Sequence, residues 1–416
     1  MSILQLREKR AEFIKNKIKN NNQTLVCIKA NYPGPDKRNL YANYTVFAIY
    51  NNLNKIFDIS DISHEFDIDG FIFIALIDES PHSVKSKTIE IENSHKLGRL
   101  VDIDVYDQNG IQISREIYNM PRRKCYICDK EAVICTKSKR HDIDILIDFY
   151  KDVVLNYLFL SCENLHLVEF CLFNELMRNI SLGSVIPNSN GSHDDMDFYT
   201  FLKGIDSLSY SLNKIKYIDT KSFSKLREFG LKCEKNLYLS TYGINTHKGV
   251  IFAFIIILAA LVNSKSFSEL QQNISELGKQ SLNDFGSSSD SNGLKVYNEY
   301  KLLGARGEAA DGYKSAFEIY IPILENGASI DDLFLNIALN TDDTNAIHRC
   351  GMEDYLSYKK QIEDILVGKG DLSSLENFCI EKKISPGGSC DMISISLLLW
   401  SIKKNFFEFK EVLKCR

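Results

Sequence analysis

The sequence predicts an α+β N-terminal domain over residues 1–155, followed by an all-α C-terminal domain over residues 156–416. The chain has 416 residues, more than a single hydrophobic core usually supports. Short runs of β-branched and aromatic residues fill the first third, whereas long apolar segments of helical length follow residue 150. This change of pattern places the domain boundary.

The N-terminal domain is expected to begin with a helix over residues 4–18, because apolar residues recur there at near-helical spacing. Its basic residues, from Arg7 to Lys17, are interpreted as a solvated face in preference to a docking surface for an acidic partner. Strands should follow, because branched and aromatic residues gather in four later runs. These runs are Thr24–Ile28, Tyr44–Tyr50, Phe71–Ile77 and Leu100–Tyr106.

The C-terminal domain is expected to consist of helices separated by polar loops. Its longest apolar run, Val250–Val262, has 13 residues, and a helix needs about 20 to cross a bilayer. We interpret this run as a buried core helix. Ser287–Gly293 has low complexity and predicts an exposed loop. The predicted helical segments are Val153–Ile180, Phe198–Leu212, Val250–Leu261 and Met392–Phe407.

The composition is that of a soluble globular protein, with 44% hydrophobic and 25% charged residues. A net charge of -5 gives no general attraction to nucleic acid. The 11 cysteines are an odd number, and the first ten residues contain no apolar signal segment. We therefore expect a reduced, cytoplasmic protein that acts neither on nucleic acid nor in a membrane.

Paired carboxylates are the main chemical signal of the N-terminal domain. Asp102 and Asp104 are two residues apart on a predicted strand and should share one face. Such a pair suits Mg²⁺ that also holds substrate phosphates, although an edge strand with a wet face shows the same pattern. Candidate phosphate-binding residues lie nearby in the sequence or in the Pro33–Lys37 turn; they are Lys37, Arg115, Arg123 and His141.

A second N-terminal signal is the spacing of Cys125, Cys128, Cys135 and His141. Thiolates and imidazole are the ligands that Zn²⁺ prefers, so the three cysteines are candidate zinc ligands. The alternative is a group of buried thiols beside a phosphate-binding histidine, because a second Cys-x2-Cys pair is missing.

Five N-terminal segments together form a family pattern: Arg7-Glu-x-Arg10, Pro33-Gly-Pro-x-Lys37, Asp102-x-Asp-Val105, Ile113-Ser-Arg115 and the block from Arg123 to His141. On these segments, residues 1–150 resemble the holo-acyl-carrier-protein synthase of citrate lyase. The resemblance implies transfer of a phosphoribosyl-dephospho-CoA group to a serine of the citrate lyase acyl carrier protein, the gamma subunit, with release of pyrophosphate. A non-enzymatic alternative is a domain that only docks the acidic carrier protein.

Five polar clusters punctuated by glycine mark the C-terminal domain. Most of them adjoin apolar segments, so their side chains can gather at helix ends around a common cleft, which suits a polyphosphate and its metal. The clusters are Gly191–Asp197, Thr241–Gly249, Gly304–Ala310, Thr341–Asn345 and Ser385–Asp391.

The first two clusters contain candidate metal ligands and bases. Asp195 and Asp197 are predicted Mg²⁺ ligands, although aspartates there could equally interact with a helix dipole. His193 or His247 is the predicted proton acceptor. Candidate phosphate ligands precede the apolar helix at Val250; they are Asn245 and Lys248.

The other three clusters contain cationic and acidic residues, and glycines that let a ligand come close to the backbone. Arg306 is a candidate phosphate ligand, and Glu308 a candidate for catalysis through metal binding or charge stabilisation; an ion pair between them is the alternative. Asp343 is a predicted Mg²⁺ ligand. In the last cluster we expect Ser389 to be an N-cap and Asp391 a first-turn residue. Candidate substrate contacts are Asn345, Gly387 and Gly388.

These clusters together resemble the triphosphoribosyl-dephospho-CoA synthase family and its malonate decarboxylase counterpart over residues 160–400. The resemblance implies that C1 of the ATP ribose is joined to the 2′-hydroxyl of 3′-dephospho-CoA and that adenine is expelled. Carboxylates would then stabilise an oxocarbenium-like ribose. Where the family has Pro-Gly-Leu-Val-Asp, this chain has Leu182-Gly-Ser-Val-Ile186.

The second enzymatic hypothesis uses water as the nucleophile. Gly304-x2-Gly-Glu and Thr341-Asp-Asp-Thr are faintly similar to helical ADP-ribosyl hydrolases. Such an enzyme would release adenine together with free triphosphoribose.

Overall fold

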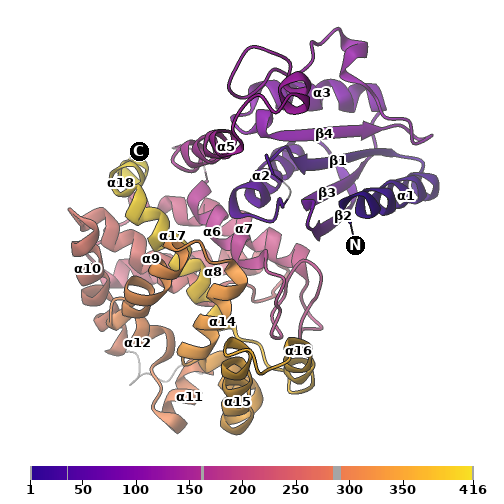
Figure 1. Cartoon of the computed structure of the whole chain (residues 1–416). Helices are drawn as coiled ribbons and strands as arrows, with labels where there is room; N and C mark the ends of the chain where they lie inside the picture. The colour runs from indigo at the N-terminus through magenta and orange to yellow at the C-terminus, as the bar shows by residue number, and fades with distance from the viewer. Residues whose placement is uncertain (1, 35, 161–163, 284–291, 415–416) are drawn as a thin grey trace. The chain divides into compact units, whose positions relative to one another are not determined.

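The computed structural model describes residues 2–34, 36–160, 164–283 and 292–414 (Figure 1). Its contacts divide the chain into one unit of residues 1–158 and another of residues 159–416. The first unit contains all the strands of the described residues, and the second is helical. The predicted fold class is therefore confirmed.

The first unit is built on a four-stranded antiparallel sheet in the order β2-β3-β1-β4. The strands are β1 (Thr24–Ala30), β2 (Ile59–Asp67), β3 (Gly70–Ile77) and β4 (Val101–Tyr106). The predictions for β1, β3 and β4 are confirmed. The central strands β1 and β3 are buried almost throughout, because helices cover both faces of the sheet.

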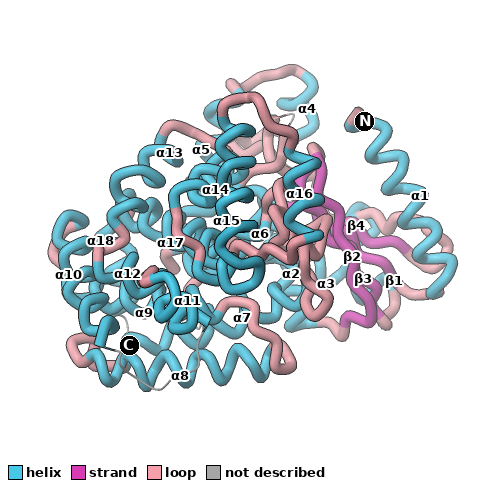
Figure 2. Tube along the Cα trace, turned by 90° about the horizontal axis from the view of Figure 1, so that it is seen from below, coloured by secondary structure: helices cyan, strands magenta, loops and turns pink. Residues whose placement is uncertain are grey.

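Helix α1 (Ile3–Asn21) packs Ile14 and Ile18 on the sheet face that contains Cys27 and Ile74. Helices α2 (Leu40–Ile56) and α3 (Pro81–Ser94) also pack on the sheet, where Tyr50 of α2 stacks on Phe73 at 3.9 Å between ring centroids. The strands lie next to these helices in Figure 2. The remaining elements are η1 (Gly98–Leu100), η2 (Arg115–Tyr118), α4 (Ala132–Lys137) and α5 (Ile143–Leu158).

One predicted strand is wrong, and one strand was missed. Tyr44–Tyr50 lies inside α2, where the Asn39 side chain caps the helix and every residue of the segment is buried. Burial on all sides favours aromatic and branched residues in a helix as well as in a strand, so composition misled the prediction. Strand β2 is an edge strand with few apolar residues, and its sequence therefore carries little strand signal.

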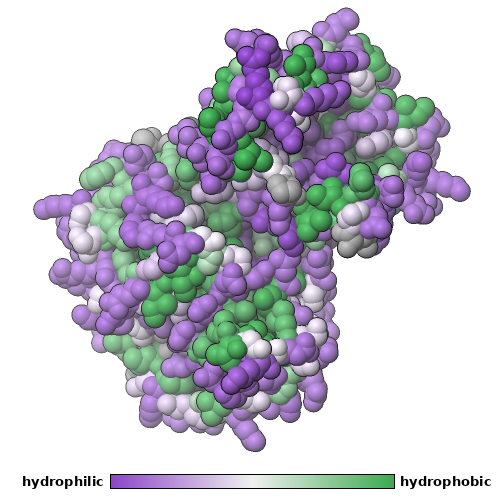
Figure 3. Space-filling view, in the orientation of Figure 1, coloured by the Kyte–Doolittle hydropathy of each residue, from purple (hydrophilic) through white to green (hydrophobic). Residues whose placement is uncertain are grey.

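The second unit packs its helices around two apolar helices, α9 (Lys248–Asn263) and α17 (Gly387–Lys404), which contact each other. Val250–Leu261 is buried except for Phe252, which confirms the predicted core helix. No helix of the described residues is both long and apolar enough to span a membrane. On the face drawn in Figure 3, apolar and hydrophilic residues are interspersed.

The other helices of this unit are mostly short and amphipathic. They are α6 (His166–Leu176), α7 (Phe198–Leu212), η3 (Asn213–Tyr217), α8 (Phe223–Ser240), α10 (Phe267–Ser281), α11 (Asn292–Tyr300), α12 (Gly304–Ala310), η5 (Ala316–Tyr320), α13 (Ile321–Glu325), α14 (Ile330–Asn340), α15 (Thr344–Leu366), α16 (Leu372–Glu381) and α18 (Phe406–Lys414).

Two long predicted segments are divided in the structure. Val153–Ile180 spans the end of α5, residues 161–163 outside the described part, and α6. Met392–Phe407 spans α17 and the first residues of α18. Of the predicted loop Ser287–Gly293, residues 287–291 lie outside the described residues, and the last two begin α11. Apolar content alone does not show where a helix ends.

Candidate functional site

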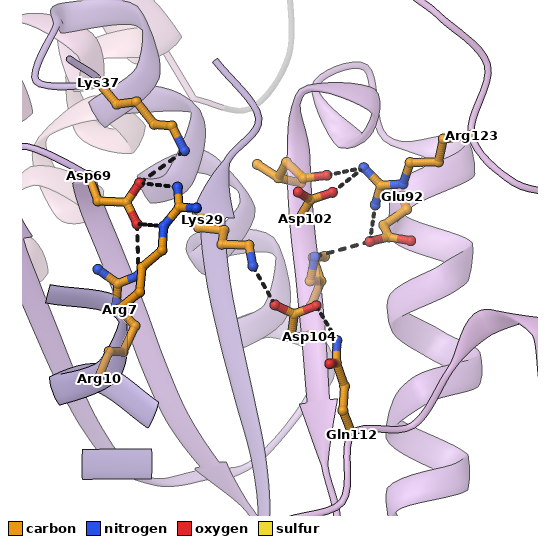
Figure 4. Close-up of polar contacts among 12 residues, drawn as sticks. Arg7, Arg10, Lys29, Lys37, Asp69, Glu92, Asp102, Asp104, Gln112 and Arg123 are labelled. Carbon is orange, nitrogen blue, oxygen red and sulfur yellow. Dashed lines mark hydrogen bonds and ion pairs between the residues drawn. The ribbon is translucent and has the colours of Figure 1, made fainter. Parts of the chain in front are cut away.

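In the first unit, Asp69 at the β2–β3 turn gathers three cations (Figure 4). Its carboxylate lies 2.8 Å from Arg7 Nη2, 2.9 Å from Arg10 Nη1 and 3.2 Å from Lys37 Nζ. Burial disfavours the charged carboxylate, but the cations prevail and hold the pKa of Asp69 well below its ordinary value. Lys37, predicted to bind phosphate, therefore already has an anionic partner; Pro35 of its turn lies outside the described residues.

The interpretation of the basic face of α1 as fully solvated is wrong for Arg10. This guanidinium is buried and pairs with Glu65 as well as Asp69. The sequence contains a signal for this pairing, since Arg10 shares its helical face with Ile14 and Ile18, one and two turns on.

Asp102 and Asp104 lie on one face of β4, as predicted, because the burial of this strand alternates. The Asp104 carboxylate accepts hydrogen bonds from Lys29 Nζ and Gln112 Nε2, both at 2.7 Å (Figure 4). Asp102 pairs with Arg123 at 2.9 Å. Burial disfavours charge on Lys29, but Asp104 outweighs this and raises its pKa. The face therefore presents alternating acids and cations.

Residues from α3 and the following loops close the outer edge of β4. Glu92 accepts a hydrogen bond from the Ile103 amide at 3.1 Å, and Lys85 Nζ donates to the Ile103 carbonyl at 2.9 Å. Arg123 also contacts Glu92 and the Val101 carbonyl. Side chains thus satisfy the backbone groups of an edge strand. Arg115 is half-buried in η2, and its Nε has no hydrogen-bond partner among the described residues.

The ligand atoms of Cys125, Cys128, Cys135 and His141 all lie within 4.8 Å of one another. Cys128 Sγ is 3.5 Å from Cys135 Sγ and 3.3 Å from His141 Nε2. Burial opposes ionisation of Cys125, but amides of Ile127 and Cys128 donate to its sulfur, and its pKa is lowered. The cluster could hold a metal ion, and it includes His141, the predicted phosphate ligand.

In the second unit, Asp343 joins the beginnings of α15 and α17. Its Oδ1 accepts from the amides of Asn345 and Ala346 at 3.1 and 3.0 Å. Its Oδ2 accepts from the amide and hydroxyl of Ser389 at 2.8 and 3.0 Å. Burial raises the pKa of Asp343 although these bonds oppose the shift. Each oxygen already accepts two hydrogen bonds, which is the geometry of a shared helix cap.

The glycines of the last cluster make room for other side chains of this unit. A Cβ on Gly388 would lie 3.2 Å from the Asp343 carboxylate, and one on Gly387 would lie 3.0 Å from Asn345 Nδ2. Asn345 Nδ2 donates to the Ser385 carbonyl at 2.9 Å. The expectation that Ser389 is the N-cap is wrong: α17 begins at Gly387, and the cap of the Ser389 amide comes from a distant part of the sequence.

The first polar cluster contacts the last one through a histidine. His193 Nε2 lies 2.8 Å from Ser385 Oγ, and its Nδ1 lies 3.6 Å from the exposed Asp195 carboxylate. Burial, followed by the nearby charge of Arg349, lowers the pKa of His193. Asp197 caps α7, accepting from the Thr200 amide at 2.8 Å. Its contacts therefore match the helix-end alternative.

The second cluster forms the start of α9. Asn245 Oδ1 accepts a hydrogen bond from the Lys248 amide at 3.1 Å, and the Lys248 ammonium pairs with Glu234. His247 is buried, its Nδ1 lies 2.9 Å from Thr246 Oγ1, and its Nε2 has no hydrogen-bond partner among the described residues. Burial lowers the pKa of His247 to about 3, so the ring is neutral at physiological pH.

The third cluster supplies α12, which contains Arg306 and Glu308. Ser315 Oγ donates to Glu308 Oε2 at 3.3 Å. Burial raises the pKa of Glu308, and the charges of Asp311 and Asp342 add to the shift. Glu308 is thus a carboxyl group poised nearer to neutral pH than an exposed one.

The sequence reasoning gave Asp391 no functional role. This residue lies in the second turn of α17, not the first, and it is partly exposed. A Cβ on Gly249 of α9 would lie 1.9 Å from its Oδ2, so the two helices meet at this carboxylate. Asp391 belongs to the last polar cluster of the sequence, but only the packing of α9 against α17 shows that its carboxylate lies against Gly249.

The turn that departs from the resembled family is also part of this unit. Ile186 is buried, and its amide donates to the Ser189 carbonyl at 2.8 Å. The buried Arg178 holds the turn: its Nη1 donates to Ser184 Oγ at 3.0 Å while Nη2 pairs with Glu175 at 2.8 Å. An apolar side chain fits the surroundings of Ile186.

Comparison with known proteins adds two family matches. A model described as apo-citrate lyase phosphoribosyl-dephospho-CoA transferase matches residues 1–157, and one described as ATP:dephospho-CoA triphosphoribosyl transferase matches residues 166–407. Protein CitXG of Haemophilus influenzae is 26% identical over 97% of this chain and 96% of its own length. Protein CitXG of Leuconostoc mesenteroides subsp. cremoris is 29% identical over 90% and 91%.

A third relative covers a smaller share of this chain. The 2-(5''-triphosphoribosyl)-3'-dephosphocoenzyme-A synthase of Haemophilus ducreyi is 27% identical over 66% of this chain and 99% of its own length. The matches support the two transferase predictions and do not support the hydrolase alternative. This chain therefore belongs to the ATP:dephospho-CoA triphosphoribosyl transferase family, and it carries an N-terminal domain of the apo-citrate lyase phosphoribosyl-dephospho-CoA transferase type.

Proposed function

We propose that each of the two units catalyses one of two successive transferase reactions, with the polar clusters described above as the sites. The chain joins ATP to 3′-dephospho-CoA with release of adenine, and it transfers phosphoribosyl-dephospho-CoA to a serine of the citrate lyase acyl carrier protein with release of pyrophosphate. The supporting observation is that the two family matches fall on the two compact units. We assign residues 1–155 to carrier-protein transfer and residues 156–416 to synthesis.

In the synthesis step, positive charge develops on the ribose of ATP while its triphosphate stays intact. The Glu308 carboxylate is suited to stabilise that ribose, because it is half-buried and accepts only a long hydrogen bond from Ser315. Arg306 and Lys248 supply positive charge for phosphates. His193 and His247 are the histidine candidates for accepting the hydroxyl proton.

Mg²⁺ is the expected cofactor of this unit, and it would neutralise phosphate charge. Among its predicted ligands, Asp195 has a largely exposed carboxylate, whereas Asp197 and Asp343 accept helix-cap hydrogen bonds. Asp195 is therefore the ligand we favour.

In the transfer step, a serine hydroxyl attacks the α-phosphate and pyrophosphate leaves. Lys29 and Arg123 can offset the charge of the leaving group, because each has a partly exposed side chain on the acidic face of β4. Asp102 and Asp104 orient these cations and are the proposed Mg²⁺ ligands, since their oxygens suit a metal that also holds phosphates.

Mass spectrometry of the purified protein with ATP, 3′-dephospho-CoA and Mg²⁺ tests both steps. We expect a triphosphoribosyl-dephospho-CoA product together with free adenine, and a mass gain on the apo carrier protein when it is added. Free adenine with triphosphoribose, and without the coupled product, would contradict the synthase assignment.

Two variants should separate the steps. Glu308→Gln should lower adenine release by about 100-fold or more, because a transition-state charge partner is lost. It should leave transfer of supplied triphosphoribosyl-dephospho-CoA unchanged. Asp104→Asn should show the opposite pattern. The assignment fails if either variant loses both steps while its thermal unfolding matches that of the wild type.

We further propose that Cys125, Cys128, Cys135 and His141 hold one structural Zn²⁺. Four protein ligands of this kind form a closed tetrahedral set without a position for substrate. Metal analysis should find about one zinc per chain, lost in Cys128→Ser and kept in the matched control Cys350→Ser, whose half-exposed thiol lies in the second unit. Full zinc content in Cys128→Ser, or none in protein purified without chelators, would refute the site.

We place the protein in the cytoplasm. All nine described cysteines are free, including the partly buried Cys125 and Cys128. Free thiols of this number persist in a reducing compartment.

A further inference from the structure

Asp391 lies where the beginnings of α9 and α17 meet. Its carboxylate is pressed against Gly249, where a Cβ would approach to 1.9 Å. Among the described residues it accepts no hydrogen bond and forms no ion pair. It is partly exposed, so a ligand at the start of α9 could reach it.

The acids around Asp391 have ion-pair or hydrogen-bond partners, whereas Asp391 has none among the described residues. Glu175 pairs with the buried Arg178 at 2.8 Å, and Asp343 accepts four hydrogen bonds. Burial, and then the charges of Glu175 and Asp343, raise the pKa of Asp391 well above its ordinary value. An ionised carboxyl group without a partner in this partly buried place destabilises the fold. We therefore infer that Asp391 has a role other than packing.

A second observation comes from Tyr313, which follows α12. Its side chain is 1% exposed, and its hydroxyl has no hydrogen-bond partner among the described residues. Burial is the main cause that raises the pKa of Tyr313. The charges of Glu308 and Asp391 raise this pKa further, so the hydroxyl lies near both acids. Its φ of 50° is left-handed, which is costly for a bulky residue. An unpartnered, buried hydroxyl thus lies within electrostatic reach of two carboxyl groups from different helices.

The two histidines are less suited to accept a proton than Asp391. His193 Nε2 is already engaged by Ser385 Oγ, and His247 is almost entirely buried, at 4% exposure. Asp391 has unengaged oxygens and lies against Gly249 in the first turn of α9, and the start of a helix favours the phosphates of a bound nucleotide.

We propose that Asp391 accepts the proton of the 2′-hydroxyl of dephospho-CoA when that oxygen attacks C1 of the ATP ribose. The new C1–O bond forms as the C1–N bond to adenine breaks. The hydroxyl proton passes to the Asp391 carboxylate, which then gives it to the departing adenine, directly or through water, so that neutral adenine leaves and the carboxylate is regenerated. Glu308 faces the charged ribose. This assignment rests on the synthase activity of the second unit.

Asp391→Asn is the first variant to measure, by adenine release and by thermal unfolding. We expect kcat to fall by about 100-fold to 10,000-fold with little change in the KM for ATP, because a general base contributes on this scale. The unfolding temperature should stay equal or rise, because an unpaired acid is removed. This combination separates a catalytic role from a structural one.

Gly249→Ala provides an independent test without altering any functional group. The new methyl would meet only the end of the Asp391 side chain, which can rotate away, so the protein should fold while kcat falls. The double variant should be no slower than Asp391→Asn alone. Gly230→Ala is the matched control, since its nearest foreign atom is Ile255 Cδ1 at 3.3 Å in the adjacent helix. We expect it to retain activity.

The outcomes are distinguishable. Adenine release within about threefold of wild type in folded Asp391→Asn would overturn the inference while leaving the synthase activity intact, because general bases contribute far more than this. A lowered unfolding temperature in that variant would make Asp391 structural and would also overturn it. If the wild type releases no adenine, the synthase assignment itself fails and the inference falls with it.

Discussion

Replacing Asp343 by alanine should destabilise the C-terminal unit by about 3–5 kcal/mol, because two helix caps of about 1–2 kcal/mol each are lost and buried donors are left unpaired. The four donors come from Asn345, Ala346 and Ser389, and the last two residues are fully buried. Water cannot replace the carboxylate at those positions. Calorimetric unfolding of the variant, with the wild type alongside, measures the loss.

Asp342→Ala is the matched control for this prediction. The neighbouring carboxylate is 60% exposed and pairs with Lys359 at 3.4 Å. An exposed pair of this kind contributes about 0–1 kcal/mol, so this control should unfold close to the wild type. Equal unfolding of the two variants would show that the shared cap contributes little. Adenine release should fall in Asp343→Ala, because the cap positions Ser389 and the start of α17.

Asp69→Ala should destabilise the N-terminal unit by about 3–5 kcal/mol, because it leaves a buried guanidinium short of its partner. The Asp69 and Arg10 side chains are 3% and 8% exposed, and Arg10 would keep only Glu65. Arg7 and Lys37 would lose their acid as well. We also expect the variant to lose carrier-protein transfer, because the β2–β3 turn no longer folds. Urea unfolding measures the loss of stability, and the mass of the carrier protein measures the loss of transfer.

Acid should reproduce part of this effect in the wild type. The folded-state pKa of Asp69 lies below its unfolded value, so its contribution to stability is complete above the unfolded pKa of about 3.9. The contribution is lost as the pH falls through the folded pKa. The difference in unfolding free energy between wild type and Asp69→Asn should therefore shrink below about pH 4.

The control for Asp69 is Asp61→Ala, which removes an acid that is 53% exposed and pairs with Lys17 of the same helix α1. A change of about 0–1 kcal/mol is expected there. A loss as large as that of Asp69→Ala would mean that the β2 edge as a whole, and not the burial of Arg10, sets the stability.

The sequence by itself determined the fold class, the helix α7 to its last residue and three of the four strands of the described residues, because periodicity and residue type are local properties. It also identified all four members of the Cys125–His141 cluster, since the other three follow Cys125 closely in the sequence. It could not separate helix from strand at Tyr44–Tyr50, where burial on every side removes the periodic signal.

Only the tertiary structure decided which polar residues act together. Asp343 caps a helix that begins 44 positions later in the chain, and Asp69 pairs with Arg10 across 59 positions. The side chains nearest to Gly387 and Gly388 are those of Asn345 and Asp343, at the start of α15. Asp391 differs from the capping aspartates only in what surrounds it, because hydrogen bonding and burial depend on packing between distant segments and not on the spacing of residues along the chain.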